Sequence, residues 1–188
     1  MAVTHEADLF DYRGWFWPVM SFSDGLRRSI MQRVIDQLEM MLLRYSRVLV
    51  VRFDLHLAEY SSNNGIISLF QARLSKRLKK KYGGEVGYAW VREQVNAIAQ
   101  HYHYALMLNG HKVNYPSSLL EMVEEIWCAL GNPKPYTPKN CYYLIHRQRD
   151  DEIKKVVYRL SYLAKNYSKR KRGKQVKDYQ TSRLKSPA

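Results

Sequence analysis

The sequence of 188 residues has only two cysteines, no long apolar run and few acidic side chains. Cys128 and Cys141 cannot form a disulfide framework, and we interpret them as reduced thiols in an intracellular compartment. The N-terminus lacks a basic region followed by an apolar run, so we expect no signal peptide. Arg44, Arg47 and Arg52 interrupt the best membrane-span candidate, which falls short of the roughly 20 apolar residues required. We therefore expect a cytoplasmic protein with no membrane contact.

Basic side chains greatly outnumber acidic ones. Thirty-one Lys and Arg against 17 Asp and Glu give a formal net charge of +14. A positive charge of this size attracts polyanions. Nucleic acid is the first expectation, and an anionic membrane surface is the alternative. A length of 188 residues predicts one domain with a real core. The charge therefore indicates a nucleic-acid-binding protein of one domain.

Composition divides the chain into three parts. Residues 1–22 are aromatic and irregular, and we expect an arm packed against the domain. Residues 23–167 carry the periodic apolar patterns of a folded domain. Residues 168–188 are basic and poor in apolar side chains, so we expect a disordered basic tail.

Apolar periodicity predicts an α+β fold. After a helix from Ser23 or Asp24 to about Tyr45, the elements expected are strand 47–57, helix 66–82, strand 86–94, strand 101–110, helix 116–130, strand 141–147 and helix 150–167. Their order contains a β-α-β-β-α-β core, the ferredoxin-like arrangement of an antiparallel sheet with its helices on one face. We expect a site on the helix-free face.

Two histidines stand at alternate positions of the predicted strand 101–110. The period of two puts His101 and His103 on one face. If strand 86–94 pairs with it as an antiparallel hairpin, Glu93 falls on the same face, opposite or one step diagonal. Two imidazoles and a carboxylate suit Mg²⁺ or Mn²⁺ in a working site, or Zn²⁺ in a structural one. A surface Glu beside two hydrogen-bonded histidines is the alternative.

Strand 47–57 turns polar on one face towards its end. Arg52, Asp54 and His56 follow Val48 and Val50 on that face. A buried strand with this change often forms the floor of a site, although a partly wetted sheet face is equally consistent. We regard the three residues as neighbours of the site.

The last predicted helix has an apolar stripe and a separate tyrosine face. At 100° per residue, Tyr158, Tyr162 and Lys165 lie together opposite that stripe. Tyrosines on helices usually pack in cores or interfaces, but the core face here is already occupied. A tyrosine hydroxyl can attack a phosphate polarised by a divalent ion while a lysine neutralises developing charge. This pattern indicates phosphodiester transfer through a phosphotyrosine.

Two further clusters of basic residues indicate DNA contacts. Helix 66–82 carries one and the tail carries the other, and each is alternatively a solvated surface. The candidate DNA-binding residues are Arg73, Lys76, Arg77, Lys79 and Lys80 on the helix, and Lys169, Arg170, Lys171 and Arg172 in the tail.

The combined motifs resemble a known superfamily. Glu93, His101-Tyr102-His103 and Tyr162-Leu163-Ala164-Lys165 are similar to the signature of HUH endonucleases, especially rolling-circle replication initiators. The run VRFDLHL, WVRE, HYHYALMLNG and YLAK resembles the inovirus gene-two product family, also called YagK/YfjJ, of phages and prophages.

This resemblance implies specific roles. His101, His103 and Glu93 would hold a divalent ion, and Tyr162 would nick single-stranded or supercoiled origin DNA, keeping a 5′-phosphotyrosyl link and leaving a 3′-OH. Lys165 would lie beside the scissile phosphate, and Tyr158 has the spacing of a second active tyrosine, although on the N-terminal side. Host helicase and polymerase are the implied partners, in the bacterial cytoplasm.

Two alternatives remain open at this point. One is a non-catalytic basic DNA-binding protein of prophage origin, and the other is a transposase of the same superfamily, which usually has Gln in place of the Lys after the tyrosine.

Overall fold

The computed structural model describes residues 7–94, 99–166 and 176–186. The elements are β1 (Asp8–Tyr12), β2 (Trp15–Val19), α1 (Arg28–Arg44), β3 (Arg47–His56), α2 (Gly65–Tyr82), β4 (Gly87–Glu93), β5 (His101–Asn109), α3 (Ser117–Cys128), β6 (Tyr142–His146), α4 (Asp150–Leu160), the 3-10 turn η1 (Ser161–Ala164) and β7 (Tyr179–Thr181). In these ranges no helix is long and apolar enough to cross a membrane.

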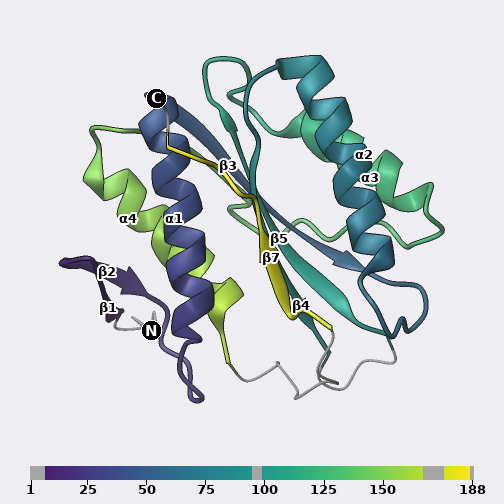
Figure 1. The fold of residues 1–188 in the computed structure, drawn as a ribbon, viewed down its shortest axis with the longest axis horizontal. Helices are drawn as coiled ribbons and strands as arrows, with labels where there is room; N and C mark the ends of the chain where they lie inside the picture. The colour runs from purple at the N-terminus through teal and green to yellow at the C-terminus, as the bar shows by residue number, and fades with distance from the viewer. Residues whose placement is uncertain (1–6, 95–98, 167–175, 187–188) are drawn as a thin grey trace.

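The central sheet has the strand order β6-β3-β5-β4-β7, and its paired strands are antiparallel (Figure 1). Its first four strands are connected as β3-α2-β4-β5-α3-β6, which is the β-α-β-β-α-β core expected from the sequence. The α+β prediction is therefore confirmed, with β7 added beside β4.

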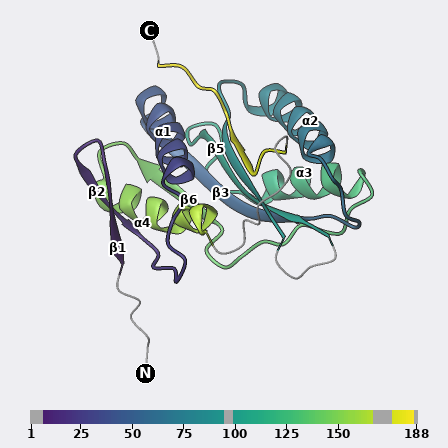
Figure 2. The same ribbon diagram turned by 60° about the horizontal axis from the view of Figure 1, so that its bottom comes forward.

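Helices cover both faces of this sheet, so the expectation of a helix-free face is wrong. α2 and α3 pack on one face, and α1 and α4 lie on the other (Figures 1 and 2). The reason is that apolar side chains of β3 point to both faces of the sheet. Leu49 and Phe53 belong to the core under α2 and α3, while Val48 and Val50 belong to the core under α1 and α4. An apolar second face requires a second helical layer.

The N-terminal arm is a β-hairpin, not the irregular segment expected. β1 and β2 pair through a two-residue turn in which Arg13 and Gly14 both have positive φ, at 54° and 77°. This backbone conformation matches the twist of a tight hairpin. Phe10 and Val19 are buried in the core beneath α1 and α4, so the arm packs on the domain as predicted.

The prediction of a disordered tail is wrong for residues 176–186. β7 pairs with β4, and the Ser182 hydroxyl hydrogen-bonds the buried Gln37 side chain of α1. Tyr179 and Leu184 pack against the core beneath α1 and α4. The few apolar residues of the tail are therefore enough to fix its second half, because β4 offers an unpaired backbone edge. Lys169, Arg170, Lys171 and Arg172 lie outside the described residues.

Candidate functional site

Six polar side chains meet at one end of the sheet, on the face covered by α1 and α4. In the strand register, His101 lies between Glu93 of β4 and His56 of β3. Two residues further along β5, His103 is paired with Asp54. The position of Glu93 directly opposite His101 agrees with the sequence-based pairing, because side chains of paired residues share a face.

Glu93, His101 and His103 form a group that could hold a divalent cation. The Glu93 Oε2 atom lies 3.0 Å from Nε2 of His103 and 3.6 Å from Nε2 of His101. One potential ligand atom from each residue lies within 4.8 Å of the others. Glu93 and His103 are buried, and the His101 side chain is 20% exposed. Two nitrogens and one oxygen converging at this spacing fit a metal ion with open coordination positions.

Asp54 orients His103 from the side away from Glu93. Its Oδ1 atom lies 2.7 Å from Nδ1 of His103, while Nε2 of the same ring faces Glu93. A carboxylate bonded to one ring nitrogen fixes the imidazole and favours the other nitrogen as a metal ligand. Asp54, expected from the sequence only as a neighbour, thus positions one member of the group.

Asp54 and His103 stabilise each other's charged forms. Burial alone would raise the pKa of Asp54, but hydrogen bonding to His103 and the charges of His103 and Arg52 hold it below its ordinary value. Burial would lower the pKa of His103, yet the hydrogen bonds with Asp54 and Glu93 raise it above its ordinary value. Asp54 and Glu93 therefore both favour the protonated form of the His103 imidazole.

Arg52 and His56 complete the polar end of β3. Arg52 is 5% exposed, and its Nη2 atom lies 3.6 Å from Asp54 Oδ1. The exposed His56 ring stacks on His101 with centroids 5.2 Å apart. The structure thus places Arg52, Asp54 and His56 beside the candidate metal ligands.

Tyr162 reaches the same place from η1. Its ring packs edge to face against His103, with centroids 5.0 Å apart. The Arg52 guanidinium carbon lies 4.3 Å from the Tyr162 ring centroid, and the Lys165 ammonium nitrogen lies 5.2 Å from it. The structure therefore brings together Tyr162, Lys165 and the candidate metal ligands from segments about 60 residues apart.

The helix carrying Tyr162 ends earlier than the predicted Tyr167. α4 ends at Leu160, and the 3-10 turn η1 follows. The segment before α1 binds the end of η1: the Arg27 amide donates to the Ala164 carbonyl at 2.8 Å, and Leu26 forms an antiparallel bridge with Lys165, where the backbone is no longer helical. The first helix accordingly begins at Arg28 and not at Ser23 or Asp24, whose side chains do not cap it.

Tyr158 has different neighbours from Tyr162. It lines a shallow surface hollow with Pro18, Tyr143 and Lys155. This differs from the shared face that ideal helical spacing predicts, because η1 has about three residues per turn and rotates Tyr162 relative to α4. The geometry thus separates the two tyrosines that the sequence placed together.

Two aromatic residues near the site were not indicated by the sequence. Phe22 lies 6.2 Å from Tyr162, ring centroid to ring centroid. Tyr136 exchanges two backbone hydrogen bonds with Asp54, of 2.8 and 2.9 Å, and its side chain is exposed. Prolines around Tyr136 marked a loop, but no local pattern indicated that this loop would extend the edge of β3.

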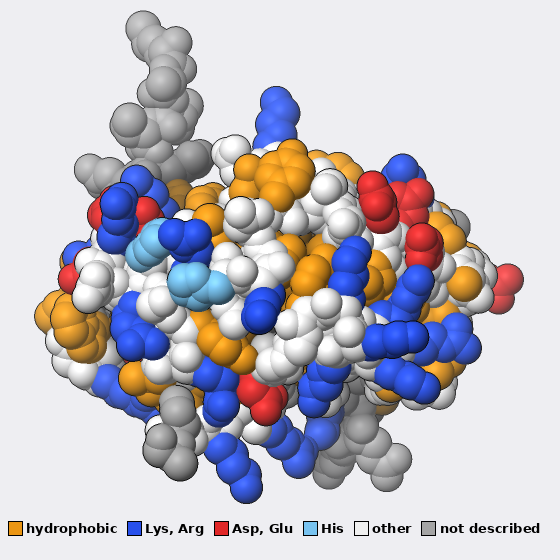
Figure 3. All heavy atoms as spheres, turned by 90° about the horizontal axis from the view of Figure 1, so that it is seen from above, with side chains coloured by type: hydrophobic (Ala, Val, Ile, Leu, Met, Phe, Trp, Pro, Cys, Tyr) orange, Lys and Arg blue, Asp and Glu red, His pale blue; other side chains and the backbone are white. Residues whose placement is uncertain are grey.

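The basic residues of α2 lie on the opposite side of the sheet from the metal-ligand group. Arg73, Lys76, Arg77, Lys79 and Lys80 are exposed there, and Arg77 pairs with Glu125 of α3 at 2.8 Å. Lys and Arg also outnumber acidic side chains on the face seen from above in Figure 3. DNA binding by these α2 residues therefore stays a prediction. It concerns a surface on the other side of the sheet from Tyr162.

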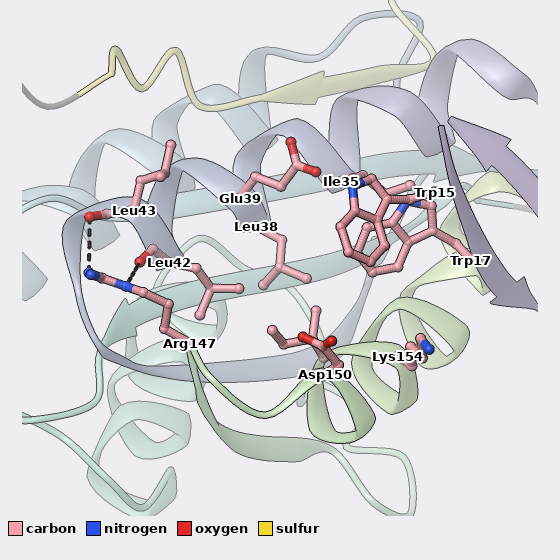
Figure 4. Close-up of a pocket in the computed structure, with 11 residues that line it drawn as sticks. Trp15, Trp17, Ile35, Leu38, Glu39, Leu42, Leu43, Arg147, Asp150 and Lys154 are labelled. Atoms are coloured by element: carbon pink, nitrogen blue, oxygen red, sulfur yellow. Dashed lines mark hydrogen bonds between the residues drawn. The ribbon is translucent and has the colours of Figure 1, made fainter. Parts of the chain in front are cut away.

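An apolar hollow of about 330 Å³ lies elsewhere, between β2, α1 and the start of α4 (Figure 4). Trp15, Trp17, Leu38 and Leu42 line it, and Arg147 closes one end by donating to the backbone carbonyls of Leu42 and Leu43. None of the described residues that line it belongs to the metal-ligand group.

Comparison with known proteins identifies a family. The model of the YagK/YfjJ C-terminal domain matches residues 16–179, which include β3 to β6, the metal-ligand group and Tyr162. A search of curated proteins and a search of solved structures gave no match. The family match spans most of the chain, and the protein belongs to the YagK/YfjJ family.

Proposed function

We propose that this protein is a metal-dependent endonuclease that nicks and rejoins single-stranded DNA through a phosphotyrosine at Tyr162. The observation that carries the proposal is the contact between the Tyr162 ring and His103, at 5.0 Å between centroids. A nucleophile and a candidate metal ligand in direct contact can act on the same phosphate.

In the proposed reaction, the Tyr162 oxygen attacks the scissile phosphorus and loses its proton to solvent. The bond from phosphorus to the 3′ oxygen breaks, and the departing oxygen takes up a proton to become a 3′-OH. The 5′-phosphate stays on Tyr162, and attack by a 3′-OH reverses the step. The phosphodiester energy is kept in the covalent link, so rejoining needs no nucleotide cofactor.

The cofactor we propose is Mg²⁺ or Mn²⁺, held by Glu93, His101 and His103. A divalent ion at this position would supply Lewis-acid polarisation of a phosphate oxygen. Asp54 would keep His103 oriented, as its 2.7 Å contact indicates. The chemistry of the donor set fits this role, since the carboxylate and the two imidazoles converge.

Two cations beside Tyr162 support phosphate chemistry. Arg52 and Lys165 each lie against its ring, at 4.3 and 5.2 Å from the centroid. We propose that they neutralise charge that develops on the phosphate during attack. Arg52 is buried and linked to Asp54, so it is held in place before substrate arrives.

The biological role we propose is initiation of rolling-circle replication of a phage or prophage. The free 3′-OH would prime a host polymerase, and a host helicase would separate the strands, both in the bacterial cytoplasm. This role rests on the similarity of the Glu93, His101-His103 and Tyr162-Lys165 pattern to HUH initiators, together with the net charge of +14.

The test is formation of a covalent protein-DNA adduct. Wild-type protein incubated with single-stranded DNA and Mn²⁺ should give a denaturant-resistant adduct that chelation prevents. Tyr162→Phe should give none, and Tyr143→Phe, a matched change at a half-buried tyrosine of β6, should behave as wild type. Salt-sensitive binding without an adduct under any divalent metal would instead indicate the non-catalytic DNA-binding alternative.

A further inference from the structure

A basic groove runs between α1 and the C-terminal segment that contains β7. It encloses a hollow of about 690 Å³. Five Lys and Arg side chains and a single acid are among its lining residues: Arg27, Arg33, Lys177, Arg183, Lys185 and Asp178. Asp178 is paired with Arg27 at 2.9 Å, which balances these two charges and leaves four other Lys and Arg side chains: Arg33, Lys177, Arg183 and Lys185. The groove is therefore strongly cationic.

Both walls of the groove are held in place. The buried Gln37 of α1 bonds the Ser182 hydroxyl, and the Ser182 amide donates to the Tyr88 carbonyl of β4 at 2.9 Å. Arg44, at the far end of α1, donates to the Lys185 carbonyl at 3.1 Å. These contacts fix the C-terminal segment along the length of α1, about 25 Å for 17 residues.

One end of the groove meets the segment that carries Tyr162. Arg27, which lines the groove, donates its amide to the Ala164 carbonyl of η1, and the adjacent Leu26 bridges Lys165. In Figure 1 the yellow C-terminal segment starts beside β4 at the lower end of the sheet and runs to the upper end of α1. A strand lying in the groove would therefore reach the candidate nucleophile at its end.

The geometry points to this groove as the binding track for the phosphate backbone of single-stranded DNA next to the nick. The inference rests on the proposed function for the choice of DNA strand. Lys and Arg that line an elongated groove neutralise successive phosphates and release counterions, which makes binding depend steeply on salt. The side chains of Arg33, Arg183 and Lys185 are exposed, and among the described residues Arg33 has only a 4.0 Å ion pair, with Asp36.

The test is the salt dependence of binding to a fluorescent oligothymidylate in EDTA, where no nicking occurs. The variant Arg33→Gln/Arg183→Gln/Lys185→Gln should reduce the slope of log affinity against log salt by about 2, at about 0.7 per phosphate contact. Lys112→Gln/Lys154→Gln/Lys155→Gln removes equal charge from exposed residues outside the groove and should keep the wild-type slope. Arg33→Lys/Arg183→Lys keeps the charge and should keep most of the slope.

An unchanged slope in the groove variant, or an equal loss in the control variant, would overturn the inference. Adduct formation with Mn²⁺ is measured separately on the same proteins. If the slope falls but wild type forms no adduct, the proposed endonuclease fails and the groove stands. If wild type forms the adduct and the slope does not change, only the groove fails.

Discussion

The imidazole of His103 is held between two carboxylates, with Nδ1 2.7 Å from Asp54 Oδ1 and Nε2 3.0 Å from Glu93 Oε2. Asp54 and Glu93 come from strands on either side of β5, so this arrangement depends on the register of three strands. Glu93 lies within 3.6 Å of both histidines, whereas Asp54 is hydrogen-bonded to His103 and acts on His101 through its charge. The two carboxylates thus have different expected effects on metal binding.

Replacing Asp54 should weaken metal binding without removing a ligand. We expect Asp54→Asn to lower Mn²⁺ affinity about 10- to 100-fold, because the His103 ring loses the carboxylate that orients it. Isothermal titration calorimetry measures the change. Asp151→Asn, an exposed acid of α4, is the matched control and should bind as wild type. Equal affinity of Asp54→Asn and the control would contradict the positioning role.

Metal affinity should rise with pH. In the metal-free protein the pKa of His103 lies above its ordinary value, because its hydrogen bonds with Asp54 and Glu93 outweigh the opposing effect of burial. Below this raised pKa a cation must displace the proton, so affinity increases as pH rises towards it and levels off above it. Calorimetry in buffers of different ionisation enthalpy should also detect proton release. Affinity independent of pH between about 5 and 8 would exclude His103 as a ligand.

Tyr158 should be dispensable for the first nick. It lies in a hollow with Pro18 and Tyr143, whereas Tyr162 contacts His103. We expect Tyr158→Phe to form the covalent adduct at a rate within about twofold of wild type, which a gel-shift time course under denaturing conditions measures. Loss of adduct in Tyr158→Phe, with Tyr162→Phe still active, would reverse the assignment of the two tyrosines.

The two halves of the tail should behave differently. Deleting residues 176–188 should lower the melting temperature, at a cost on the order of 2 kcal/mol, because Tyr179 and Leu184 pack on the core and β7 covers the edge of β4. The quadruple change to Gln at residues 169–172 should keep the melting temperature and flatten the salt dependence of DNA binding by up to about 3 in slope. A stable deletion variant would show that β7 contributes little.

Strand patterns allowed more of the site to be predicted than helical patterns did. The period of two in β4 and β5 was sufficient to place Glu93 with His101, because side-chain parity survives small errors in strand ends. It also placed Asp54 at the site, although its bond to His103 depends on the pairing of β3 with β5, which lies about 50 residues away in the chain.

Features set by distant contacts could not be predicted from local patterns. The helical path through α4 and η1 ends at Ala164, where Leu26 and Arg27, more than 130 residues earlier, pair with Lys165 and Ala164. The order of residues 176–186 depends on Gln37 and on the edge of β4, and neither is evident from the composition of the tail. The second helical layer was not evident from the pattern because Val48 and Val50 share their face of β3 with Arg52, Asp54 and His56, and a face of mixed polarity is typical of a solvent-exposed sheet surface.

The most direct test is the identity of the residue that carries DNA after nicking. Trypsin cuts after Lys155, Arg159 and Lys165, so Tyr158 and Tyr162 fall in different peptides, 156–159 and 160–165. The protein is allowed to react with single-stranded DNA and Mn²⁺, and nuclease then removes the bulk of the DNA. Mass spectrometry should find a nucleotide linked through its 5′-phosphate to peptide 160–165. A modification on peptide 156–159, or none on either peptide while DNA is cleaved, would contradict Tyr162 as the nucleophile.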